Sequence, residues 1–426
     1  MRPPLSWTDL PGRTVGVWGL GVEGRANVAQ LHRLGIDPVV VADESELAAG
    51  GLASLMQCEV VVKSPGISRY RDEAVALVDN GIALVGGLGL WLQDAPLDRV
   101  VVITGTKGKS TTTAVVGHLL DGFGHRCFVG GNIGRVPYAD DVDEDEYEFW
   151  ALEVSSYQAT DLAVTPRVAA VTSLHPDHLP WHGGEVQHYY RDKLSAMSQP
   201  GAEWTVANDL SEPLRTHAAL LGPHVRWVPD EDSPTSGWAD ELGLLGAHNK
   251  VNAEIARAVI ELLGMPEACD DNALRAAARG FVPLPSRLTR IGVVHGVEFV
   301  DDSLSTNVLP TLAAVDAFPG RRIALIVGGE DRGIDYEPLA AGLELRRDPL
   351  LVLTVPDSGA RIAHAIGSRS AVRQCADLTD AVHQAYAWAR PDGVVLLSPA
   401  APSFGRFHDY RDRAAAFASV LADLSA

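Results

Sequence analysis

A glycine-rich turn within residues 102–113 constrains the fold and the chemistry of this chain more than any other segment. The segment reads Val-Ile-Thr-Gly-Thr-Lys-Gly-Lys-Ser-Thr-Thr-Thr and overlaps a β-branched run at 99–104 that predicts a buried strand. Helical spacing continues over 111–120. Between a strand and a helix, glycines allow backbone N–H groups to approach an anion. The sequence therefore predicts a phosphate-binding loop, made of Gly105, Thr106, Lys107, Gly108, Lys109, Ser110 and Thr111.

Within this loop, we expect Lys109 on the β- and γ-phosphates of a nucleotide and the Ser110 hydroxyl on Mg²⁺. Only two residues separate Gly105 from Gly108, whereas the usual nucleotide-binding loop has four residues there. The alternative is a tight strand-to-helix turn in which Gly-Lys-Ser occurs by chance. The strand and helix patterns on both sides favour an enzyme that uses a nucleoside triphosphate.

The composition limits the classes of protein to consider. The 426 residues carry a formal net charge of −20, which disfavours binding to nucleic acid or to an anionic membrane surface. No apolar run approaches the roughly 20 residues of a membrane span and the N-terminus lacks a signal-peptide core, so we expect a cytoplasmic protein. The four cysteines lie far apart, which predicts neither a disulfide framework nor a thiolate metal site.

Strands and helices alternate along three blocks, which predicts an α/β protein with parallel sheets and three domains. The blocks are 1–92, 93–284 and 285–426. We expect a Rossmann-like first domain, a central domain like a phosphate-loop ATPase, and a Rossmann-like C-terminal domain. The expected strands are 13–19, 38–42, 58–63, 99–104, 149–153, 168–174, 204–207, 297–300, 322–327, 350–354 and 393–397.

The first block begins like a dinucleotide-binding unit. Gly19, Gly21 and Gly24 follow a strand, and Asp43 ends the next strand, where such units place an acidic residue for a ribose or base. An NAD-dependent dehydrogenase, a site for a different nucleotide, and plain tight packing all explain this pattern. A third strand runs into the turn 64–68, Ser-Pro-Gly-Ile-Ser, at the sheet edge where ligands bind.

Polar side chains follow two expected strands of the central block. Glu153 ends one strand, and His175 and His178 follow the next, so a carboxylate and an imidazole beside the phosphate loop could complete a Mg²⁺ site. These histidines with His182 alternatively suggest zinc or plain loop residues, although prolines at 176 and 180 oppose the continuous helix that a zinc spacing needs. By spacing alone, Lys193 on its amphipathic helix is a solvated surface residue.

Several motifs together resemble the Mur ligases, the ATP-dependent enzymes that build the peptide of bacterial cell-wall precursors. The motifs occur in the family's order and span essentially the whole chain. They are the loop 104–111, Gly130-Gly-Asn-Ile-Gly134, Glu153-Val-Ser-Ser-Tyr-Gln158, His175-Pro-Asp-His178, Lys193 and His248-Asn-Lys-Val-Asn252. The segments 19–24 and 63–68 resemble the MurD type, whose first domain holds the UDP part of UDP-N-acetylmuramoyl-L-alanine. This resemblance displaces the NAD interpretation.

The resemblance implies a reaction in two steps. The terminal carboxylate of the UDP-sugar-alanine attacks the γ-phosphate of ATP, and the amine of an amino acid then displaces phosphate from the acyl phosphate. Lys193 matches a lysine that is carbamylated in this family and holds a second Mg²⁺, and Asn132 matches a residue that orients the substrate.

The resemblance also assigns residues to each ligand. The implied magnesium-binding residues are Ser110, Glu153, His178 and Lys193. The implied ATP-binding residues outside the loop are Asn249, Asn252, Arg287 and Asp302. The implied UDP-substrate residues are Gly21, Val22, Glu23, Asp43, Ser64, Pro65 and Gly66. The implied amino-acid-binding residues are Thr306, Arg332, Ser403 and Tyr410.

The third block departs from the MurD pattern at one position. Ligases that add D-glutamate usually carry Asp-Ser-Lys-Ala-Thr-Asn, whereas residues 302–307 read Asp-Ser-Leu-Ser-Thr-Asn. Leu304 cannot pair with a carboxylate, although a cation remains at Arg332. The strings at 61–68, 178–183 and 398–407 resemble most the variant that adds L-glutamate, which a partner epimerase then inverts. The ordinary type, which adds D-glutamate, is the alternative.

Rival classes make different predictions. A dehydrogenase would bind nicotinamide, and a nucleotide-gated binding protein would bind ATP without releasing ADP. Folylpolyglutamate synthetases share the ligase chemistry, but their first domain is not this UDP-type unit. We expect a peptidoglycan-synthesis enzyme of cell-wall growth and division that uses ATP, two Mg²⁺ ions, UDP-N-acetylmuramoyl-L-alanine and glutamate.

Overall fold

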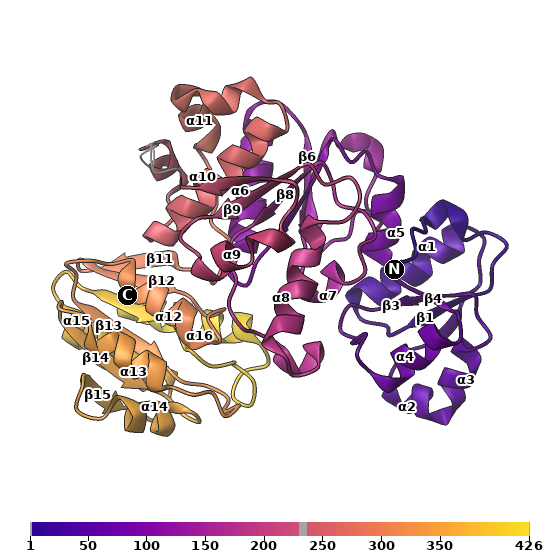
Figure 1. Cartoon of the computed structure of the whole chain (residues 1–426). Helices are drawn as coiled ribbons and strands as arrows, with labels where there is room; N and C mark the ends of the chain where they lie inside the picture. Colours follow the sequence, from indigo (N-terminus) through magenta and orange to yellow (C-terminus); the bar gives the residue numbers. More distant parts are fainter. Residues whose placement is uncertain (1, 230–236, 426) are drawn as a thin grey trace. The chain divides into compact units, whose positions relative to one another are not determined.

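The computed structural model describes residues 2–229 and 237–425, whose strands form three sheets (Figure 1). Every strand expected from the sequence is present, with bounds shifted by at most a few residues. Apart from one antiparallel hairpin, all paired strands are parallel, as alternating strands and helices require. The prediction of an α/β protein with three domains is confirmed.

The first sheet has four parallel strands in the order β2-β1-β3-β4. All four residues of β1 and of β3 are buried, which explains why these strands read as continuous apolar runs. The strands are β1 (Val15–Trp18), β2 (Val39–Val41), β3 (Val60–Lys63) and β4 (Ala83–Gly86). The helices are α1 (Val22–Arg33), α2 (Glu44–Glu46), α3 (Leu52–Leu55), α4 (Asp72–Asp79) and α5 (Gly87–Asp94).

The second sheet has six parallel strands in the order β10-β9-β8-β5-β7-β6. The strands are β5 (Val100–Thr104), β6 (Cys127–Gly131), β7 (Phe149–Glu153), β8 (Val168–Val171), β9 (Trp204–Asn208) and β10 (His224–Val228). The helices are α6 (Lys109–Gly122), α7 (Ser156–Ala159), α8 (Val186–Leu194), α9 (Glu212–Thr216), α10 (Ala247–Leu262) and α11 (Asp271–Ala278). The strands that follow β5 in the sequence lie on both sides of it: β6 and β7 on one side, and β8, β9 and β10 on the other. The carboxyl end of β5 is therefore a topological switch point, where ligands of open sheets bind.

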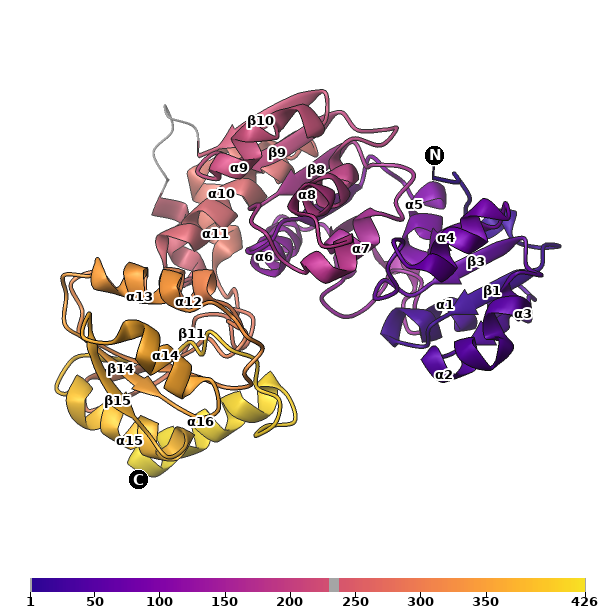
Figure 2. The ribbon, with the colours of Figure 1, turned by 60° about the horizontal axis from the view of Figure 1, so that its bottom comes forward.

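The third sheet has the order β11-β12-β16-β13-β14-β15, with β11 antiparallel to β12. Because β16 returns to the middle, right-handed crossovers place α12 and α13 on one face and α15 on the other, where the C-terminal α16 packs beside α15 (Figure 2). The strands are β11 (Thr289–Val294), β12 (Val297–Asp301), β13 (Ile323–Val327), β14 (Leu350–Thr354), β15 (Ala371–Gln374) and β16 (Val394–Leu397). The helices are α12 (Val308–Asp316), α13 (Glu337–Glu344), α14 (Gly359–Ile366), α15 (Leu378–Ala389) and α16 (Tyr410–Ser425).

The sheets group into two compact units. The first unit contains Met1–Glu241 and Val251–Phe281, and therefore both the first and the second sheet. One hydrophobic core is shared by these two sheets, because Val17 and Val62 of the first belong to the same buried cluster as Val102 and Leu152 of the second. The second unit contains Leu242–Lys250 and Val282–Ala426, with separate hydrophobic clusters on the two faces of the third sheet.

Five strands are absent from the sequence prediction: β4, β6, β10, β11 and β15. All five lie at the edges of their sheets. An edge strand pairs on one side only, and most residues of β10, β11 and β15 are not buried, so these three strands carry a weaker apolar signal. In β15, for example, no residue is buried.

Candidate functional site

The predicted phosphate loop lies at the centre of the second sheet. It connects β5 to α6, and β5 pairs with β7 on one side and with β8 on the other. Glu153 therefore ends the strand on one side of the loop, and His175 and His178 follow the strand on the other side. This topology brings together the central-block residues that the sequence analysis selected.

The segment after β8 holds the loop through hydrogen bonds. The backbone N–H of Thr106 donates to the carbonyl oxygen of Ser173 at 2.8 Å, and the N–H of Lys107 donates to the Ser173 hydroxyl at 2.8 Å. The Thr106 hydroxyl also lies 2.9 Å from the Tyr189 hydroxyl. The prediction of a strand through residue 174 was wrong at its end, because β8 stops at Val171 and the next residues bind the loop. Sequence patterns did not indicate this role for Ser173 and Tyr189.

Two glycines of the loop are required by close contacts. Gly105 has a φ of +139°, and a Cβ there would lie 2.1 Å from the Thr172 hydroxyl oxygen. Gly108 has a φ of +91°, and its Cβ would lie 2.6 Å from Oδ1 of Asn252, a buried residue of α10. The amide of Asn252 therefore packs directly against the loop. Asn249, one turn earlier on α10, is also buried, and its amide donates to the carbonyl oxygen of Leu245 at 2.8 Å.

Both predicted catalytic lysines point at the phosphate loop. Lys109 Nζ donates to the carbonyl oxygens of Gly105 at 2.9 Å and of Thr106 at 3.3 Å, and Lys193 Nζ donates to Gly105 at 3.0 Å. Lys193 is only 2% exposed. Its burial, and next the charge of Lys109, hold the pKa of Lys193 well below its ordinary value. The interpretation of Lys193 from spacing alone, as a solvated surface residue, was wrong because α8 turns it into the protein.

An acidic centre lies beside these cations. The buried Glu153 carboxylate accepts hydrogen bonds from the Ser110 hydroxyl and, at 2.7 Å, from the Asn132 amide. Among these three residues, a hydroxyl and a carboxylate offer oxygen ligands, which suit Mg²⁺. Across the described residues, no three His, Cys, Asp or Glu side chains form a group that could hold a metal. Ser110 and Glu153 fit Mg²⁺ nevertheless, because that ion usually takes one or two carboxylates with water and substrate phosphates.

The three histidines after β8 do not share one helix face. His178 has a φ of +50° and an exposed side chain, immediately before the 3-10 helix η4 (Leu179–His182). His182 is fully buried and lies between Asp192 and Ser156, at 2.6 and 3.0 Å. The alternative of a zinc site on a continuous helix was therefore wrong, because residues 175–178 are not helical and His182 has other partners.

The first-sheet residues expected at the UDP substrate differ in their exposure. Val22 is exposed, whereas Glu23 is 8% exposed and accepts from the amide of Gln158 at 2.9 Å. Burial raises the pKa of Glu23 to about 7. The Ser64 hydroxyl donates to the carbonyl oxygen of Gly19 at 2.8 Å, and the exposed Asp43 carboxylate caps α2 by accepting from the N–H groups of Ser45 and Glu46. Gly21 caps α1. Pro65 and Gly66 lie in the turn after β3.

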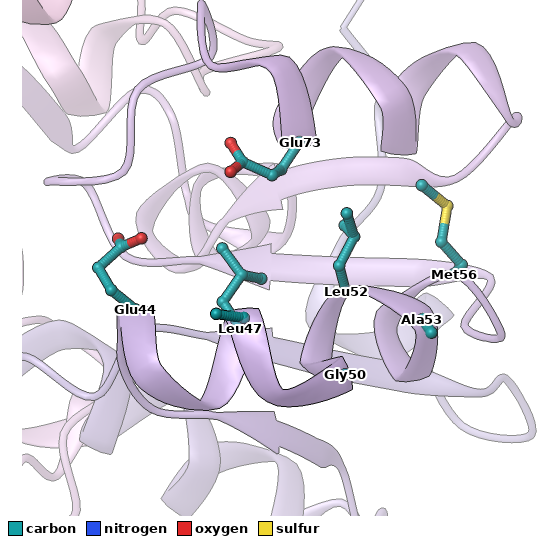
Figure 3. A pocket seen from close by; sticks show the side chains of 8 residues that line it. Glu44, Leu47, Gly50, Leu52, Ala53, Met56 and Glu73 are labelled. Atoms are coloured by element: carbon teal, nitrogen blue, oxygen red, sulfur yellow. The ribbon is translucent and has the colours of Figure 1, made fainter.

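A pocket of about 540 Å³ opens in the first domain between the α2–α3 segment and the start of α4. Figure 3 shows Leu47, Leu52 and Met56 on the α2–α3 side and Glu73 on the opposite side. Its two carboxylates, Glu44 and Glu73, both accept hydrogen bonds from Arg71. The other lining residues are Ala48, Gly50 and Ala53. The pocket thus has an apolar surface and a polar rim of two carboxylates that share one arginine.

Charged side chains join the first sheet to the second, a connection that the sequence patterns did not indicate. Asp161 lies 2.7 Å from Lys63 Nζ and 2.6 Å from Arg69 Nε, and both Asp161 and Lys63 are buried. The two cations hold the pKa of Asp161 below its ordinary value despite its burial. Lys63 directly precedes the turn at residues 64–68, so this ion cluster fixes that turn against the second sheet.

In the third sheet, Asp302 is turned inward. Its carboxylate accepts from the hydroxyls of Ser305 and Ser398 at 2.6 and 2.7 Å and from the N–H of Leu288 at 3.1 Å. Burial raises the pKa of Asp302 to about 7. Arg287, the residue before Leu288, is half-buried. The hydrogen bonds of Asp302 therefore hold the chain segment that carries Arg287.

The residues expected at the amino acid follow the carboxyl ends of β12, β13 and β16. The half-exposed Arg332 donates to Glu330 at 2.7 Å and lies over the ring of Phe404 at 5.6 Å. Ser403 is buried and lines a cavity of about 210 Å³ with Arg406 and Arg413. Thr306 and Tyr410 are half-buried, as is Leu304.

This arrangement defines a class of protein. Three α/β domains with a phosphate loop at the switch point of the central sheet, two lysines on that loop and a buried carboxylate beside it describe an enzyme that activates a substrate with a nucleoside triphosphate. Within residues 2–229 and 237–425, no helix is long and apolar enough to cross a membrane.

Comparison with known proteins narrows this class. The Mur ligase middle domain matches residues 103–221, and the Mur ligase glutamate ligase domain matches residues 286–401. A Micromonospora protein named UDP-N-acetylmuramoyl-L-alanine–L-glutamate ligase is 40% identical, over 98% of this chain and 98% of its own. The chain therefore belongs to the Mur ligase family and is an ATP-dependent, ADP-forming ligase.

Solved structures share the fold at low sequence identity. The UDP-N-acetylmuramate–alanine ligase of Thermotoga maritima has a TM-score of 0.57 and 18% identity, over 96% of this chain and 99% of its own. A bifunctional folylpolyglutamate synthase/dihydrofolate synthase of Yersinia pestis, complexed with AMPPNP and a manganese ion, has a TM-score of 0.52 and 17% identity. That likeness covers 78% of this chain and 89% of the synthase.

Proposed function

We propose that this chain ligates L-glutamate to the terminal carboxylate of UDP-N-acetylmuramoyl-L-alanine during peptidoglycan precursor synthesis. The observation that carries the proposal is the convergence of Lys109 and Lys193 on Gly105, beside the buried pair of Ser110 and Glu153. Relatives of 36 to 40% identity over nearly the whole chain, whose names state this reaction, support the choice of substrates.

The first step activates the acceptor. A carboxylate oxygen of the alanyl group attacks the γ-phosphorus of ATP, and the bond to the bridging oxygen of ADP breaks, which gives an acyl phosphate. Lys109 and the N–H groups of the loop stabilise the charge on the transferred phosphoryl group. Ser110, Glu153, His178 and a carbamylated Lys193 would hold two Mg²⁺ ions, which would neutralise further phosphate charge. Asn132 orients the acceptor.

The second step forms the amide. The glutamate amine attacks the acyl carbon, the carbon–oxygen bond to phosphate breaks, and the amine proton leaves to solvent. We assign the glutamate to the C-terminal domain (285–426), ATP to the central domain (93–284) and the UDP group to the first domain (1–92). Asn249, Asn252, Arg287 and Asp302 complete the ATP site in this assignment. Thr306, Arg332, Ser403 and Tyr410 contact the glutamate, and the turn with Gly66 contacts the UDP substrate.

The choice of L-glutamate depends on Leu304. An apolar side chain at this position offers no charge to a carboxylate, so the carboxylates of the amino acid must lie closer to Arg332. With its carboxylates in that different position, L-glutamate and not D-glutamate presents its amine to the acyl phosphate. The product would then carry an L-glutamyl residue, and a separate epimerase would invert that centre.

The test is ADP release with UDP-N-acetylmuramoyl-L-alanine and each glutamate enantiomer, followed by hydrolysis of the product and determination of its glutamate chirality. We expect kcat/KM for L-glutamate to exceed that for D-glutamate by at least about a hundredfold, because an unpaired buried carboxylate costs several kcal/mol. Folate-type acceptors serve as the control for the synthetase alternative. Efficient turnover with D-glutamate and none with L-glutamate would assign the chain to the ordinary MurD reaction.

A further inference from the structure

A hydrogen-bonded chain runs through His182. The ring is fully buried, with Nδ1 at 2.6 Å from Oδ2 of Asp192 and Nε2 at 3.0 Å from the Ser156 hydroxyl. A carboxylate only accepts hydrogen bonds, so Nδ1 carries a proton and the ring orientation is fixed. His182 therefore connects α7 to α8 through η4.

Each member of this trio lies close in sequence to a proposed metal ligand. Ser156 is three residues after Glu153, His182 is four residues after His178, and Asp192 directly precedes Lys193. The three ligands come from three separate segments, and His182 is the side chain that contacts two of these segments while belonging to the third. A shift of His182 would therefore change the spacing of all three ligands.

The chain extends to the first sheet. The hydroxyl of Tyr70 lies 3.0 and 3.2 Å from the two carboxylate oxygens of Asp192. Next to it, the indole N–H of Trp181 donates to the carbonyl oxygen of Gly66 at 2.9 Å. Gly66 belongs to the turn that we assign to the UDP substrate. The same short segment, Trp181 and His182, thus contacts both the substrate turn and the metal-bearing segments.

The trio has the residue types of a nucleophile, a base and an orienting acid. Ser156 is only 3% exposed and begins α7, and its hydroxyl lies against the buried His182 ring. The geometry instead suits a role in which the hydrogen bonds hold backbone segments in place.

We propose that His182 is a positioning residue that couples the acceptor turn to the metal-bearing segments through Tyr70, Asp192 and Ser156. This inference rests on the proposed function, because the coupling would keep the acceptor carboxylate aligned with the γ-phosphate of ATP. A misplacement of about 1 Å at such a centre costs roughly a hundredfold in rate.

The experiment is a double-mutant cycle at the two ends of the chain. Tyr70→Phe and Ser156→Ala each remove one hydroxyl and keep the rest of the side chain. We expect each variant to lower kcat about tenfold or more with little change in the KM for ATP, and the double variant to lose little more than either single variant, since one break already uncouples the ends. Tyr386→Phe is the matched control, because it removes a hydroxyl that lies 2.8 Å from Nδ1 of His295 in the C-terminal unit.

A second readout does not need turnover. Calorimetry of ATP binding with and without Mg²⁺ should show a smaller gain of affinity from Mg²⁺ in Ser156→Ala than in the wild type. Additive losses in kcat, or wild-type kinetics and Mg²⁺ dependence in both variants, would overturn the inference. Tyr70 is partly exposed, so Tyr70→Phe should fold even where Ser156→Ala does not. Its effect on kcat then tests the inference alone. A wild-type enzyme that binds Mg²⁺-ATP yet releases no ADP with any amino acid would contradict the proposed function instead.

Discussion

Lys109 and Lys193 donate to the same atom, the carbonyl oxygen of Gly105, at 2.9 and 3.0 Å. Two ammonium groups on one oxygen repel each other, and Lys193 is in addition almost fully buried. Addition of CO₂ to Lys193 would replace its positive charge by a carboxylate. The repulsion would then become an attraction, and a new oxygen ligand would stand beside the phosphate loop.

We therefore predict that activity depends on a carbamate at Lys193. Only a neutral amine reacts with CO₂, and the lowered pKa of Lys193 makes the neutral form available at a lower pH than for an exposed lysine, with activation weakening as the pH falls further. Degassed enzyme should regain activity when bicarbonate is added, and Lys193→Arg should lose at least about a hundredfold in kcat. An arginine variant with full activity would remove Lys193 from the mechanism.

Lys109→Ala should abolish turnover and leave the fold intact. The Lys109 ammonium donates to the loop carbonyls of Gly105 and Thr106, and its charge is needed when the γ-phosphoryl group is transferred. We expect a loss of roughly a thousandfold or more in kcat, measured by ADP release, with an unchanged circular dichroism spectrum. Arg126→Ala removes an exposed cation that precedes β6, at the end of the second sheet opposite the loop, and serves as the control. Wild-type kcat in Lys109→Ala would exclude the loop lysine from catalysis.

Glu23 should make the folded state less stable as the pH rises. Burial raises its pKa from 4.5 to about 7, so the folded protein holds this proton more tightly than the unfolded chain does. The unfolding free energy should therefore fall between about pH 4.5 and pH 7 and level off above that range, by on the order of 3 kcal/mol for this group.

Urea unfolding of the wild type and of Glu23→Gln at pH 5 and pH 8 measures this contribution. The wild type should lose more stability between the two values than the variant, whose amide does not ionise. Asp302, whose pKa is also raised to about 7, is present in both proteins and cancels in the comparison. Equal losses in the two proteins would show that Glu23 keeps an ordinary pKa.

The central strands and the phosphate loop were predictable because their signals are local. A strand buried on both faces, such as β5, reads as a continuous apolar run, and glycines at a strand-to-helix turn mark an anion site. Edge strands such as β15 lack the continuous apolar run and were missed. Glu153 was also predictable, because a carboxylate at the end of a strand beside the loop lies at the ligand edge.

The burial of Lys193 and the partners of His182 could not be read from spacing. Both depend on how α8 packs against the second sheet, which brings together residues far apart in the chain. The contact of Lys63 with Asp161 spans two sheets and has no sequence pattern at all. The family resemblance selected Lys193 where residue chemistry alone did not, because it draws on many sequences that share this packing.

Arg332 should control the affinity for glutamate and not that for the other substrates. Its guanidinium follows β13 at the carboxyl end of the third sheet, over the ring of Phe404, and Leu304 leaves it as the cation that we assign to the amino acid's carboxylates. Arg332→Ala should raise the KM for glutamate about tenfold or more, in keeping with the loss of a charge-assisted hydrogen bond, with unchanged KM values for ATP and the acceptor. Arg322→Ala is the matched control, because Arg322 lies over the ring of Trp388 at 5.2 Å and precedes the same strand, at the opposite edge of the sheet. Equal effects of the two substitutions on the KM for glutamate would place the amino acid away from Arg332.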